Sequence, residues 1–367
     1  MSEREDKGKV LVNGAGGFLG SHTVEYLMEA GYTVRATDLP NSDLSVAEAA
    51  GAEVVKADLL EPEGIPGLLD GMEKVVNIAG FFKFSLPPDV LKKANVDVTR
   101  NMCEAALKAG IKRFVHIASI AVYGRPRAFP MREDHPRNPS NNYERTKCDG
   151  EDLVMRYYRE HGLPAASLRP AGIYGPRSRY GQTTMMCLLA LVKHAGKRRI
   201  PALKGGPFMH YVHVRDVAQG IKVLLEADGV EGSCYNVADD SPLSQGDFFK
   251  VAMRAYGLEI TFQFPYFTRL YWPFIRMLIA LPDSQFDKIN AWLGKKWRDM
   301  ISAYDLDPAL SASLDRDFLG YMRSSYALDT TKLKALGYTP HYPDLRTEFL
   351  ESIRWYQEAG WLPEFKE

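Results

Sequence analysis

The stretch Lys9–Gly20, KVLVNGAGGFLG, decides the fold of this chain of 367 residues. It begins as an apolar run and continues with Gly14, Gly17 and Gly20, each three positions after the last. Glycine permits positive φ angles and lets a ligand approach the backbone closely. The N–H groups at the start of the following helix would then face a phosphate. A glycine pattern between a strand and a helix predicts a dinucleotide-binding turn, and a tight turn without a ligand is the simpler alternative.

Outward from this turn, short apolar runs alternate with amphipathic stretches through the first two-thirds of the chain. The runs are KVLVNGAG, YTVRATD, AEVVKAD, KVVNIAG, RFVHIAS and AASLRPAGIYG, and helical patterns such as VTRNMCEAALKAG separate most of them. Repeated strand–helix–strand units imply a parallel sheet with helices on both faces. With right-handed crossovers, the predicted fold is α/β, a doubly wound parallel sheet with a smaller C-terminal substrate lobe.

The pattern changes near Arg177, and this change sets the predicted domain boundaries. Residues 1–175 would form the dinucleotide-binding domain, with 207–238 returning to it. Residues 176–206 and 239–367 would form the substrate lobe.

The composition limits the classes of partner and compartment. The chain carries 46 Lys and Arg against 46 Asp and Glu, so no electrostatic attraction to nucleic acid is expected. Its four cysteines lack metal-ligand spacing, which predicts free thiols, no metal site and a cytoplasmic protein. No signal peptide follows the charged start MSEREDKGK. No uncharged apolar run reaches about 18 residues, so no transmembrane helix is expected.

Two carboxylates follow the next strands. Asp38 ends the second run roughly 20 residues after the glycines, where an acid hydrogen-bonds an adenosine ribose. A carboxylate there would repel a 2′-phosphate, so NAD is predicted in preference to NADP; the alternative is that Asp38 caps a turn. Arg35 precedes it in the same strand and could point elsewhere. Asp58, at the end of the third run, would meet the adenine amine or form a turn.

Tyr143 and Lys147, in NNYERTKCDG, are the predicted reacting pair. Residues four apart share one helix face. A free phenol has a pKa near 10 and is a poor base at pH 7, and a nearby ammonium together with a positive nicotinamide would lower it. Ser119, after the run RFVHIAS, could donate a hydrogen bond to a substrate oxygen. An exposed surface pair is the alternative for the tyrosine and the lysine.

At these residues the chain resembles the extended short-chain dehydrogenase/reductase family, within the NAD-dependent epimerase/dehydratase superfamily, over nearly its whole length. The motifs are GAGGFLG, NIAG, ASIAVYG, YERTK, RPAGIYGP, HVRDVAQG and DTTKLKALGYTP. The resemblance implies a Rossmann domain in which Tyr143 is the acid/base, Ser119 orients the substrate, Lys147 binds ribose and Asn95 supports the site. The residues that it assigns to the cofactor are Gly14, Gly17, Phe18, Leu19, Gly20, Asp38, Asp58, Leu59, Ala79, Gly80, Tyr143, Lys147, Pro170 and Ile173.

Three positions depart from the family pattern near the site. Asn13 stands where threonine is usual before the first glycine, NIAG at 77–80 replaces a more common H-x-A-A, and Thr146 replaces a serine before the lysine. None of the three removes a reacting group, so activity is expected.

Two further departures bear on the substrate. Relatives that act on nucleotide sugars usually have an arginine where this chain has Met209, and an asparagine where it has Gly172. Arginine matches the geometry of a diphosphate, so both changes weaken the expected grip on a nucleotide sugar. RPAGIYGP followed by YVHV instead resembles the 3β-hydroxysteroid dehydrogenase and sterol-4-carboxylate 3-dehydrogenase group.

The segment 261–300 supports an apolar substrate. Its aromatic residues would form a large wall for a substrate with few polar groups, and its cations suit an interfacial amphipathic helix. The alternatives are the core of the small lobe and a solvated charged face. The apolar residues are Phe262, Phe264, Tyr266, Phe267, Tyr271, Trp272, Phe274 and Ile275, and the cations are Arg269, Arg276, Lys288, Lys295, Lys296 and Arg298.

These observations predict an NAD-dependent oxidoreductase that transfers a hydride between a secondary alcohol and nicotinamide. The predicted substrate is a 3β-hydroxysteroid, a sterol or a similar hydrophobic molecule. The alternatives are a nucleotide-sugar epimerase or dehydratase, a dihydroflavonol-type reductase and a non-catalytic NAD-binding protein. A homodimer and a peripheral membrane contact through 261–300 are also expected.

Overall fold

The computed structural model describes residues 7–82, 86–321 and 323–365 and divides them into two compact units. The first unit comprises Met1–Ile173, Val212–Ala238 and Leu328–His341, and the second comprises Tyr174–Tyr211, Asp239–Ala327 and Tyr342–Glu367. These ranges differ from the predicted boundaries at three places, the first being residues 174–175, which belong to the second unit. Residues 207–211 belong to the second unit, and 328–341, which the prediction gave to the substrate lobe, belong to the first.

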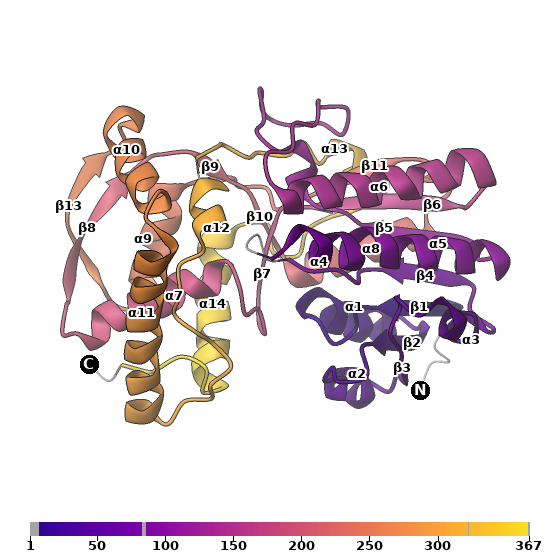
Figure 1. Cartoon of the computed structure of the whole chain (residues 1–367), viewed down its shortest axis with the longest axis horizontal. Coiled ribbons are helices and arrows are strands. Elements are labelled where there is room, and N and C mark those ends of the chain that lie inside the picture. Colours follow the sequence, from indigo (N-terminus) through magenta and orange to yellow (C-terminus); the bar gives the residue numbers. More distant parts are fainter. Residues whose placement is uncertain (1–6, 83–85, 322, 366–367) are drawn as a thin grey trace. The chain divides into compact units, whose positions relative to one another are not determined.

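A seven-stranded parallel sheet forms the centre of the first unit, in the order β11-β6-β5-β4-β1-β2-β3 (Figure 1). The doubly wound α/β fold is therefore confirmed. The order reverses between β1 and β4, and in such sheets ligands bind outside the carboxyl ends of the strands at this reversal. The strands are β1 (Lys9–Asn13), β2 (Thr33–Asp38), β3 (Glu53–Lys56), β4 (Lys74–Asn77), β5 (Arg113–Ile117), β6 (Ala165–Pro170) and β11 (Cys234–Val237).

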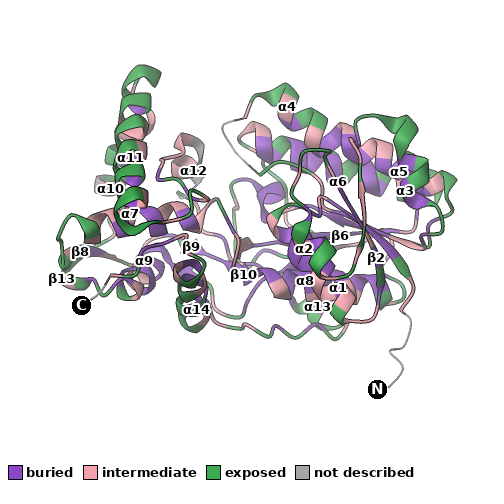
Figure 2. Ribbon diagram, turned by 90° about the horizontal axis from the view of Figure 1, so that it is seen from below, coloured by how far each residue is buried: buried purple, intermediate pink, exposed green. Residues whose placement is uncertain are grey.

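Helices cover both faces of this sheet, as its continuous apolar strands require. Figure 2 shows the buried strands between the two layers. On one face α1 (Phe18–Glu29) packs with α8 (Val214–Glu226), and on the other α5 (Val98–Lys108) packs with α6 (Asn142–His161) and α3 (Ile65–Leu69). The remaining helical segments are α2 (Ser45–Ala49), η1 (Pro62–Gly64), α4 (Pro88–Lys92), η2 (Lys93–Asp97), η3 (Ile120–Tyr123) and α13 (Thr331–Lys334). Two short strands, β7 (Gly172–Tyr174) and β10 (Tyr211–His213), lie where the chain passes between the units.

The second unit combines small strand pairs with helices. Strands β8 (Arg199–Lys204) and β13 (Glu259–Pro265) form a parallel ribbon, and α9 (Gln245–Ala255) packs against it. A second, antiparallel pair joins β9 (Phe208–Met209) to β12 (Leu243–Ser244). The other helices are α7 (Gln182–His194), α10 (Thr268–Ile279), α11 (Asp283–Tyr304), α12 (Arg316–Tyr321) and α14 (Leu345–Glu358).

The sequence predicted free thiols, no metal site and no transmembrane helix. The four cysteines are free, and three of them are buried. Within the described ranges, no group of three or more His, Cys, Asp or Glu side chains is arranged to hold a metal ion. None of the described helices combines the length and apolarity needed to cross a membrane. Residues 1–6, which make up most of the charged start MSEREDKGK, lie outside the described residues.

The segment 261–300 divides in two: Phe286, Leu293, Trp297 and Met300 of α11 are buried, whereas the apolar residues named for a substrate wall are mostly not. Phe262 is 61% exposed and Phe274 is 58% exposed, whereas Ile275 is buried. Phe264 and Phe267 are also exposed, and Tyr266, Tyr271 and Trp272 are half-buried. The core alternative therefore fails for most of these side chains.

Candidate functional site

The glycine turn between β1 and α1 is shaped by close contacts. Gly14 has φ of +67°, and a Cβ there would lie 2.9 Å from the Ala79 nitrogen. A Cβ on Gly20 would collide with the Gly14 carbonyl oxygen. Helix α1 begins after Gly17 with no side chain capping it and no acidic residue in its first turn. Its first N–H groups thus lack a side-chain cap, which suits a pyrophosphate at a helix N-terminus.

Other predicted cofactor residues surround this turn. Phe18 is half-buried and packs edge-to-face on His22, and Leu19 is buried. Ala79 and Gly80 follow β4, and the Gly14–Ala79 contact brings this loop against the glycine turn at the reversal of the sheet. Because these glycines have no Cβ atoms, a ligand can approach the backbone of the turn closely. The turn therefore fits a dinucleotide phosphate.

Asp38 lies beside the same turn. One oxygen of its carboxylate accepts a hydrogen bond from the Gly16 nitrogen at 2.9 Å, and the other accepts from Leu39 N and Ser42 Oγ. The alternative prediction, that Asp38 caps a turn, therefore describes part of what this carboxylate does. Its position next to the glycine turn is also the one that an adenosine ribose requires.

Arg35 points away from Asp38's turn. Its guanidinium donates to the carbonyl oxygens of Leu68 and Asp70 at 2.9 and 3.1 Å, and it pairs with Glu53 at 2.9 Å. An arginine held in this way cannot bind a 2′-phosphate without giving up those partners.

Asp58 and Leu59 make other contacts than those of Asp38 and Arg35. Asp58 accepts a hydrogen bond from the Leu60 nitrogen at 2.9 Å, so it forms the turn that the sequence left open for it. The Leu59 side chain is 5% exposed and joins the apolar core under α5. Only the backbone of Leu59 is left for a cofactor contact, and its carbonyl oxygen already accepts from Asn101 at 2.9 Å.

Helix α6 carries the predicted reacting pair. The helix begins after Asn141, whose side chain accepts from Glu144 N at 2.8 Å, while Glu144 reaches back to the Ser140 nitrogen. This reciprocal capping sets where the first turn starts. Tyr143 in that turn is 4% exposed and Lys147 one turn later is 9% exposed. The surface-pair alternative is therefore excluded.

Ser119 is oriented by its own backbone turn. It caps η3 by accepting from the Ala121 nitrogen at 3.1 Å, and it also hydrogen-bonds Tyr143. The serine and the tyrosine come from different elements and meet at the carboxyl end of β5. Lys147 donates to the Ile117 carbonyl oxygen at 2.7 Å, which fixes its ammonium below that strand end.

In the chain without a nicotinamide, burial raises the pKa of Tyr143 above its ordinary value, and the Ser119 hydrogen bond offsets only part of this. The predicted lowering included the positive charge of a bound nicotinamide, so it stays a prediction for the complex with the cofactor. Burial also lowers the pKa of Lys147 to about 8, with Glu151 acting against it, so the ammonium is still favoured at pH 7.

Asn95 links the loop after β4 to α6. It is buried in η2, a π-helical turn, a feature that often occurs at functional sites. Its side chain accepts from Phe81 N at 2.9 Å and donates to Thr146 Oγ1 at 3.1 Å. A Cβ on Gly80 or on Gly150 would strike Asn95 oxygens, so both glycines are needed for this approach.

The three departures from the family pattern are connected in space. Asn13 donates to Asn77 at 2.7 Å and accepts from the nitrogens of both residues that follow β4. Asn77 is 3.3 Å from Thr99 Oγ1, which donates to the Asn95 carbonyl oxygen at 3.0 Å. Through Asn95 the chain of hydrogen bonds reaches Thr146. The residues at the three departures are thus far apart in the sequence but are linked by one network of hydrogen bonds.

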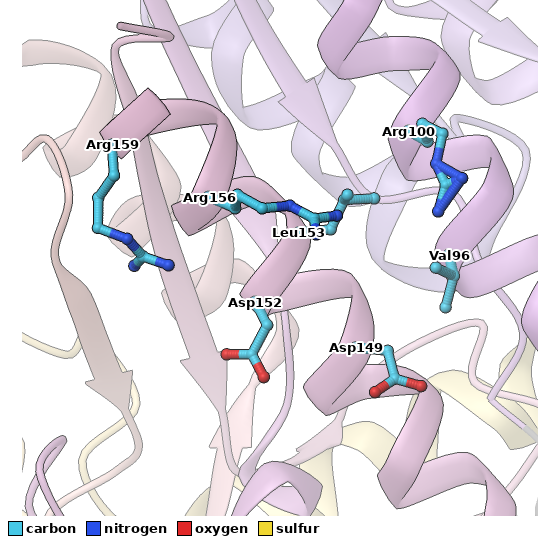
Figure 3. A pocket seen from close by; sticks show the side chains of 7 residues that line it. All are labelled: Val96, Arg100, Asp149, Asp152, Leu153, Arg156 and Arg159. Atoms are coloured by element: carbon cyan, nitrogen blue, oxygen red, sulfur yellow. The ribbon is translucent and has the colours of Figure 1, made fainter. Parts of the chain in front are cut away.

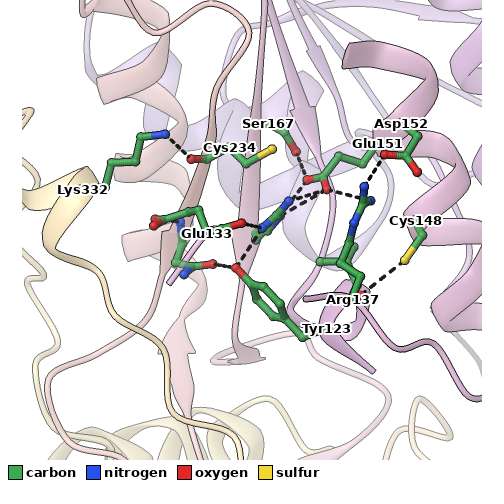
Figure 4. Close-up of polar contacts among 12 residues, drawn as sticks. Tyr123, Glu133, Arg137, Cys148, Glu151, Asp152, Ser167, Cys234 and Lys332 are labelled. Carbon is green, nitrogen blue, oxygen red and sulfur yellow. Dashed lines mark hydrogen bonds and ion pairs between the residues drawn. The ribbon is translucent and has the colours of Figure 1, made fainter. Parts of the chain in front are cut away.

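Beyond the predicted residues, a buried ion pair anchors α6 to β6 (Figure 4). Arg169 binds Glu151 through two nitrogens at 2.9 and 2.8 Å, and Ser167 donates to the same carboxylate at 2.7 Å. Arg169 also donates to Tyr123 Oη at 2.9 Å and to the Glu133 carbonyl oxygen at 2.8 Å. The sequence signal for this pair was an arginine inside the apolar run AASLRPAGIYG.

The remaining predicted residues lie at the end of β6 and in the second unit. Pro170 is buried beside Val237 of β11, and Ile173 is half-buried in β7. Met209 is 8% exposed and is paired with Leu243 in the second unit. Gly172, the other substrate-related position, is half-buried in β7.

An open depression of about 470 Å³ lies along α5 and α6 and is lined by neither Tyr143 nor Lys147 (Figure 3). Side chains of both charges line it, which gives it no single ligand preference. Its residues are Val96, Arg100, Asp149, Asp152, Leu153, Arg156 and Arg159. It contains none of the predicted catalytic or cofactor residues.

Known proteins with similar sequences and structures agree with this geometry. The chain is 31% identical over 236 residues to a UDP-glucose 4-epimerase of Mycolicibacterium smegmatis, covering 61% of this chain and 74% of the relative. It superimposes on the crystal structure of gox2253 with a TM-score of 0.74 and 25% identity, over 97% of this chain and 100% of that one. For the dTDP-glucose 4,6-dehydratase DesIV of Streptomyces venezuelae, solved with NAD bound, the TM-score is 0.71 at 20% identity, covering 97% and 99% of the two chains.

The family follows from the sequence itself. The model of the family described as "NAD dependent epimerase/dehydratase family" matches residues 10–238, which span the whole seven-stranded sheet except the first residue of β1. The predicted cofactor, NAD, is the one that the family's description names. The chain therefore belongs to the NAD-dependent epimerase/dehydratase family.

Proposed function

We propose that this chain is an NAD-dependent enzyme that oxidises a secondary alcohol of a nucleoside-diphosphate sugar and returns the hydride within one turnover, as epimerases and dehydratases do. The observation that carries the proposal is the set Ser119, Tyr143 and Lys147 at the carboxyl end of β5, in which the tyrosine and the lysine are buried and the serine is half-buried. These three side chains can hold a carbinol oxygen, move its proton and stabilise the resulting charge.

The residues would divide the reaction as follows. Ser119 holds the carbinol oxygen, and Tyr143 accepts its proton during oxidation and gives it back during reduction. The Lys147 ammonium favours the phenolate and would hold the hydroxyls of the nicotinamide ribose. NAD, when bound, supplies the carbon that accepts the hydride and a positive charge near the phenol. Asn95 keeps the start of α6 against the loop after β4.

Support for the sugar substrate comes from the relatives. Their described activities concern UDP-glucose and dTDP-glucose. They favour the nucleotide-sugar alternative over the 3β-hydroxysteroid subgroup that the sequence pattern indicated.

A second candidate is a hydrophobic secondary alcohol such as a 3β-hydroxysteroid. Met209 favours it, because this buried apolar side chain stands where nucleotide-sugar enzymes usually have the diphosphate-binding arginine. A buried diphosphate without a guanidinium would lose charge-assisted hydrogen bonds and keep its desolvation cost.

Two parallel assays distinguish the nucleotide-sugar candidate from the steroid candidate. We would incubate purified protein with NAD and UDP-glucose or dTDP-glucose and follow epimer or keto-sugar formation by chromatography. In parallel we would follow NADH absorbance with a 3β-hydroxysteroid. Conversion of a nucleotide sugar without net NADH is the expected result. Steroid-dependent NADH formation, with no binding of either nucleotide sugar, would replace the first candidate with the second.

Cofactor preference offers an independent test. The protein should bind NADH more tightly than NADPH, since the Asp38 carboxylate repels a 2′-phosphate and Arg35 is held by other partners. Asp38→Gly should narrow this difference by roughly tenfold, about 1.4 kcal/mol. Calorimetric titration of both cofactors measures it, with Asp43→Gly as the control in the same loop. Equal affinities in the unsubstituted protein would refute the assignment of Asp38.

A further inference from the structure

The second unit exposes a group of large apolar side chains that no part of the proposed reaction uses. We call Phe262, Phe264, Phe267, Phe274 and Met277 the aromatic patch. Their exposed fractions are 61, 42, 56, 58 and 60%. They lie within 16 consecutive positions of the chain, on β13, on α10 and, for Phe267, in the turn between them (Figure 1). Single exposed apolar residues are ordinary, but a cluster of this kind marks an interaction surface.

On β13 the geometry places two phenylalanines side by side. Phe262 and Phe264 are two residues apart on the strand, next to a shift in its register between Ile260 and Gln263. Their ring centroids are 6.3 Å apart. The strand has one partner in its sheet, β8, and the exposed Lys204 of β8 is aligned with Pro265 at the end next to α10.

On α10 the burial pattern separates an inner from an outer face. Ile275 is buried, with half-buried Tyr271 and Ile279 one turn before and after it, and the helix packs on α12. At about 100° per residue, Phe274 and Met277 lie on the outer face. The exposed Arg269 and Arg276 occupy the side of that outer face next to Met277.

Between the acidic residues Glu259 and Asp283, every charged side chain of the chain is a cation. Between Thr261 and Pro282 the chain contains Arg269 and Arg276 and no acidic residue, although the whole chain has equal numbers of both charges. Exposed aromatic rings flanked by cations are complementary to a surface whose outer layer is anionic and whose interior is apolar.

We propose that the aromatic patch docks on the surface of a lipid bilayer containing anionic headgroups. The rings would enter the boundary between headgroups and acyl chains, and Lys204, Arg269 and Arg276 would contact the headgroup phosphates. Helix α10 has 12 residues, whereas a spanning helix needs about 20, so the contact is peripheral.

A second copy of the chain fits this face less well. In a two-fold dimer the same patch contacts itself, which would bring the arginines of both copies together without an acidic partner between 261 and 282. Anionic headgroups neutralise those arginines instead. The inference concerns binding alone and does not depend on which alcohol the enzyme oxidises.

Vesicle flotation tests the proposal with the full-length protein. Binding is measured to phosphatidylcholine vesicles with and without 30% phosphatidylglycerol. The salt concentration is varied over about a tenfold range, which changes how strongly the charges are screened. We expect binding to the anionic vesicles at low salt and at least tenfold weaker binding at high salt. The double substitution Phe262→Gln/Phe264→Gln should weaken binding at least tenfold, and Arg269→Gln/Arg276→Gln should remove most of the salt dependence.

Phe129→Gln is the matched control, because Phe129 is 55% exposed and lies in the other unit. It should bind vesicles as the unsubstituted protein does. Circular dichroism and NADH affinity, unchanged in all variants, show that each protein is folded. The proposal is overturned by an absence of binding at low salt, or by equal loss in the Phe129 variant. It is also overturned if the two phenylalanine substitutions abolish a dimer seen by sedimentation, since a second copy would then occupy the patch.

Discussion

Tyr143→Phe should lower turnover by about 100- to 10,000-fold, the range that general acid–base catalysis contributes. The substitution removes one hydroxyl from a buried side chain that is hydrogen-bonded to Ser119, and it keeps the ring that packs on Phe82 with centroids 5.3 Å apart. The affinity for NADH should change less than threefold, because the phenol acts on the proton of the substrate and makes no phosphate contact. Single-turnover kinetics and fluorescence titration measure the two quantities separately.

Tyr157→Phe is the matched control for this prediction. Tyr157 lies on the same helix, is half-buried and uses its hydroxyl for an exposed bond to Glu104 at 3.1 Å. Its loss should leave turnover within a factor of two. Lys147→Met should instead lower both turnover and NADH affinity, because the ammonium is assigned to the phenol and to the ribose. A Tyr143→Phe enzyme that keeps more than a tenth of normal turnover would exclude the assigned role.

Arg169→Met should destabilise the first unit by about 3–5 kcal/mol, the cost of removing one partner of a buried ion pair. The Glu151 carboxylate would remain in the interior, where its side chain is 1% exposed, with Arg137 at 3.5 Å as the cation next to it. Two other hydrogen bonds of Arg169, to Tyr123 and to Glu133, would be lost as well. Chemical denaturation at pH 7 measures the change, and turnover should fall with it because α6 carries Tyr143.

The double variant Glu151→Gln/Arg169→Met isolates the cause of this loss. Removing the second charge should restore at least half of the stability lost in Arg169→Met, because the interior then holds no unpaired ion. Burial by itself raises the pKa of Glu151, but Arg169 and Ser167 lower it more, so its pKa lies below the ordinary value of a carboxyl. The pair thus stabilises the fold above the unfolded pKa and loses that contribution as the pH falls through the folded one. Additive losses in the double variant would contradict this account.

The fold was largely predictable from the sequence. The alternation of apolar runs with amphipathic helices is a local signal, and the strands β1 to β6 lie where those runs predicted them. The glycine turn and the Tyr143–Lys147 spacing are also local, since one turn of helix brings residues four apart onto one face. Domain boundaries were less accurate, because a segment such as 328–341 returns to the first unit through tertiary packing that no local pattern announces.

The electrostatics of the site could not be predicted in the same way. The sequence shows that a lysine follows the tyrosine by four residues, but not that both are buried, and in the chain without a cofactor burial raises the pKa of Tyr143. The cost of moving a charge out of water depends on everything packed around it. Likewise, Asn13, Asn77 and Thr146 read as separate departures until hydrogen bonds connected them.

By itself, then, the sequence determined the doubly wound sheet, the glycine turn and the Tyr143–Lys147 pair proposed to react, because these depend on period and spacing along the chain. Only the tertiary structure decided which groups became partners. It placed Arg169 against Glu151, turned Arg35 away from Asp38, and left Phe262 and Phe274 exposed where the pattern allowed a core. Each of these outcomes depends on burial and on contacts between residues distant in the sequence, which are properties of the packed chain.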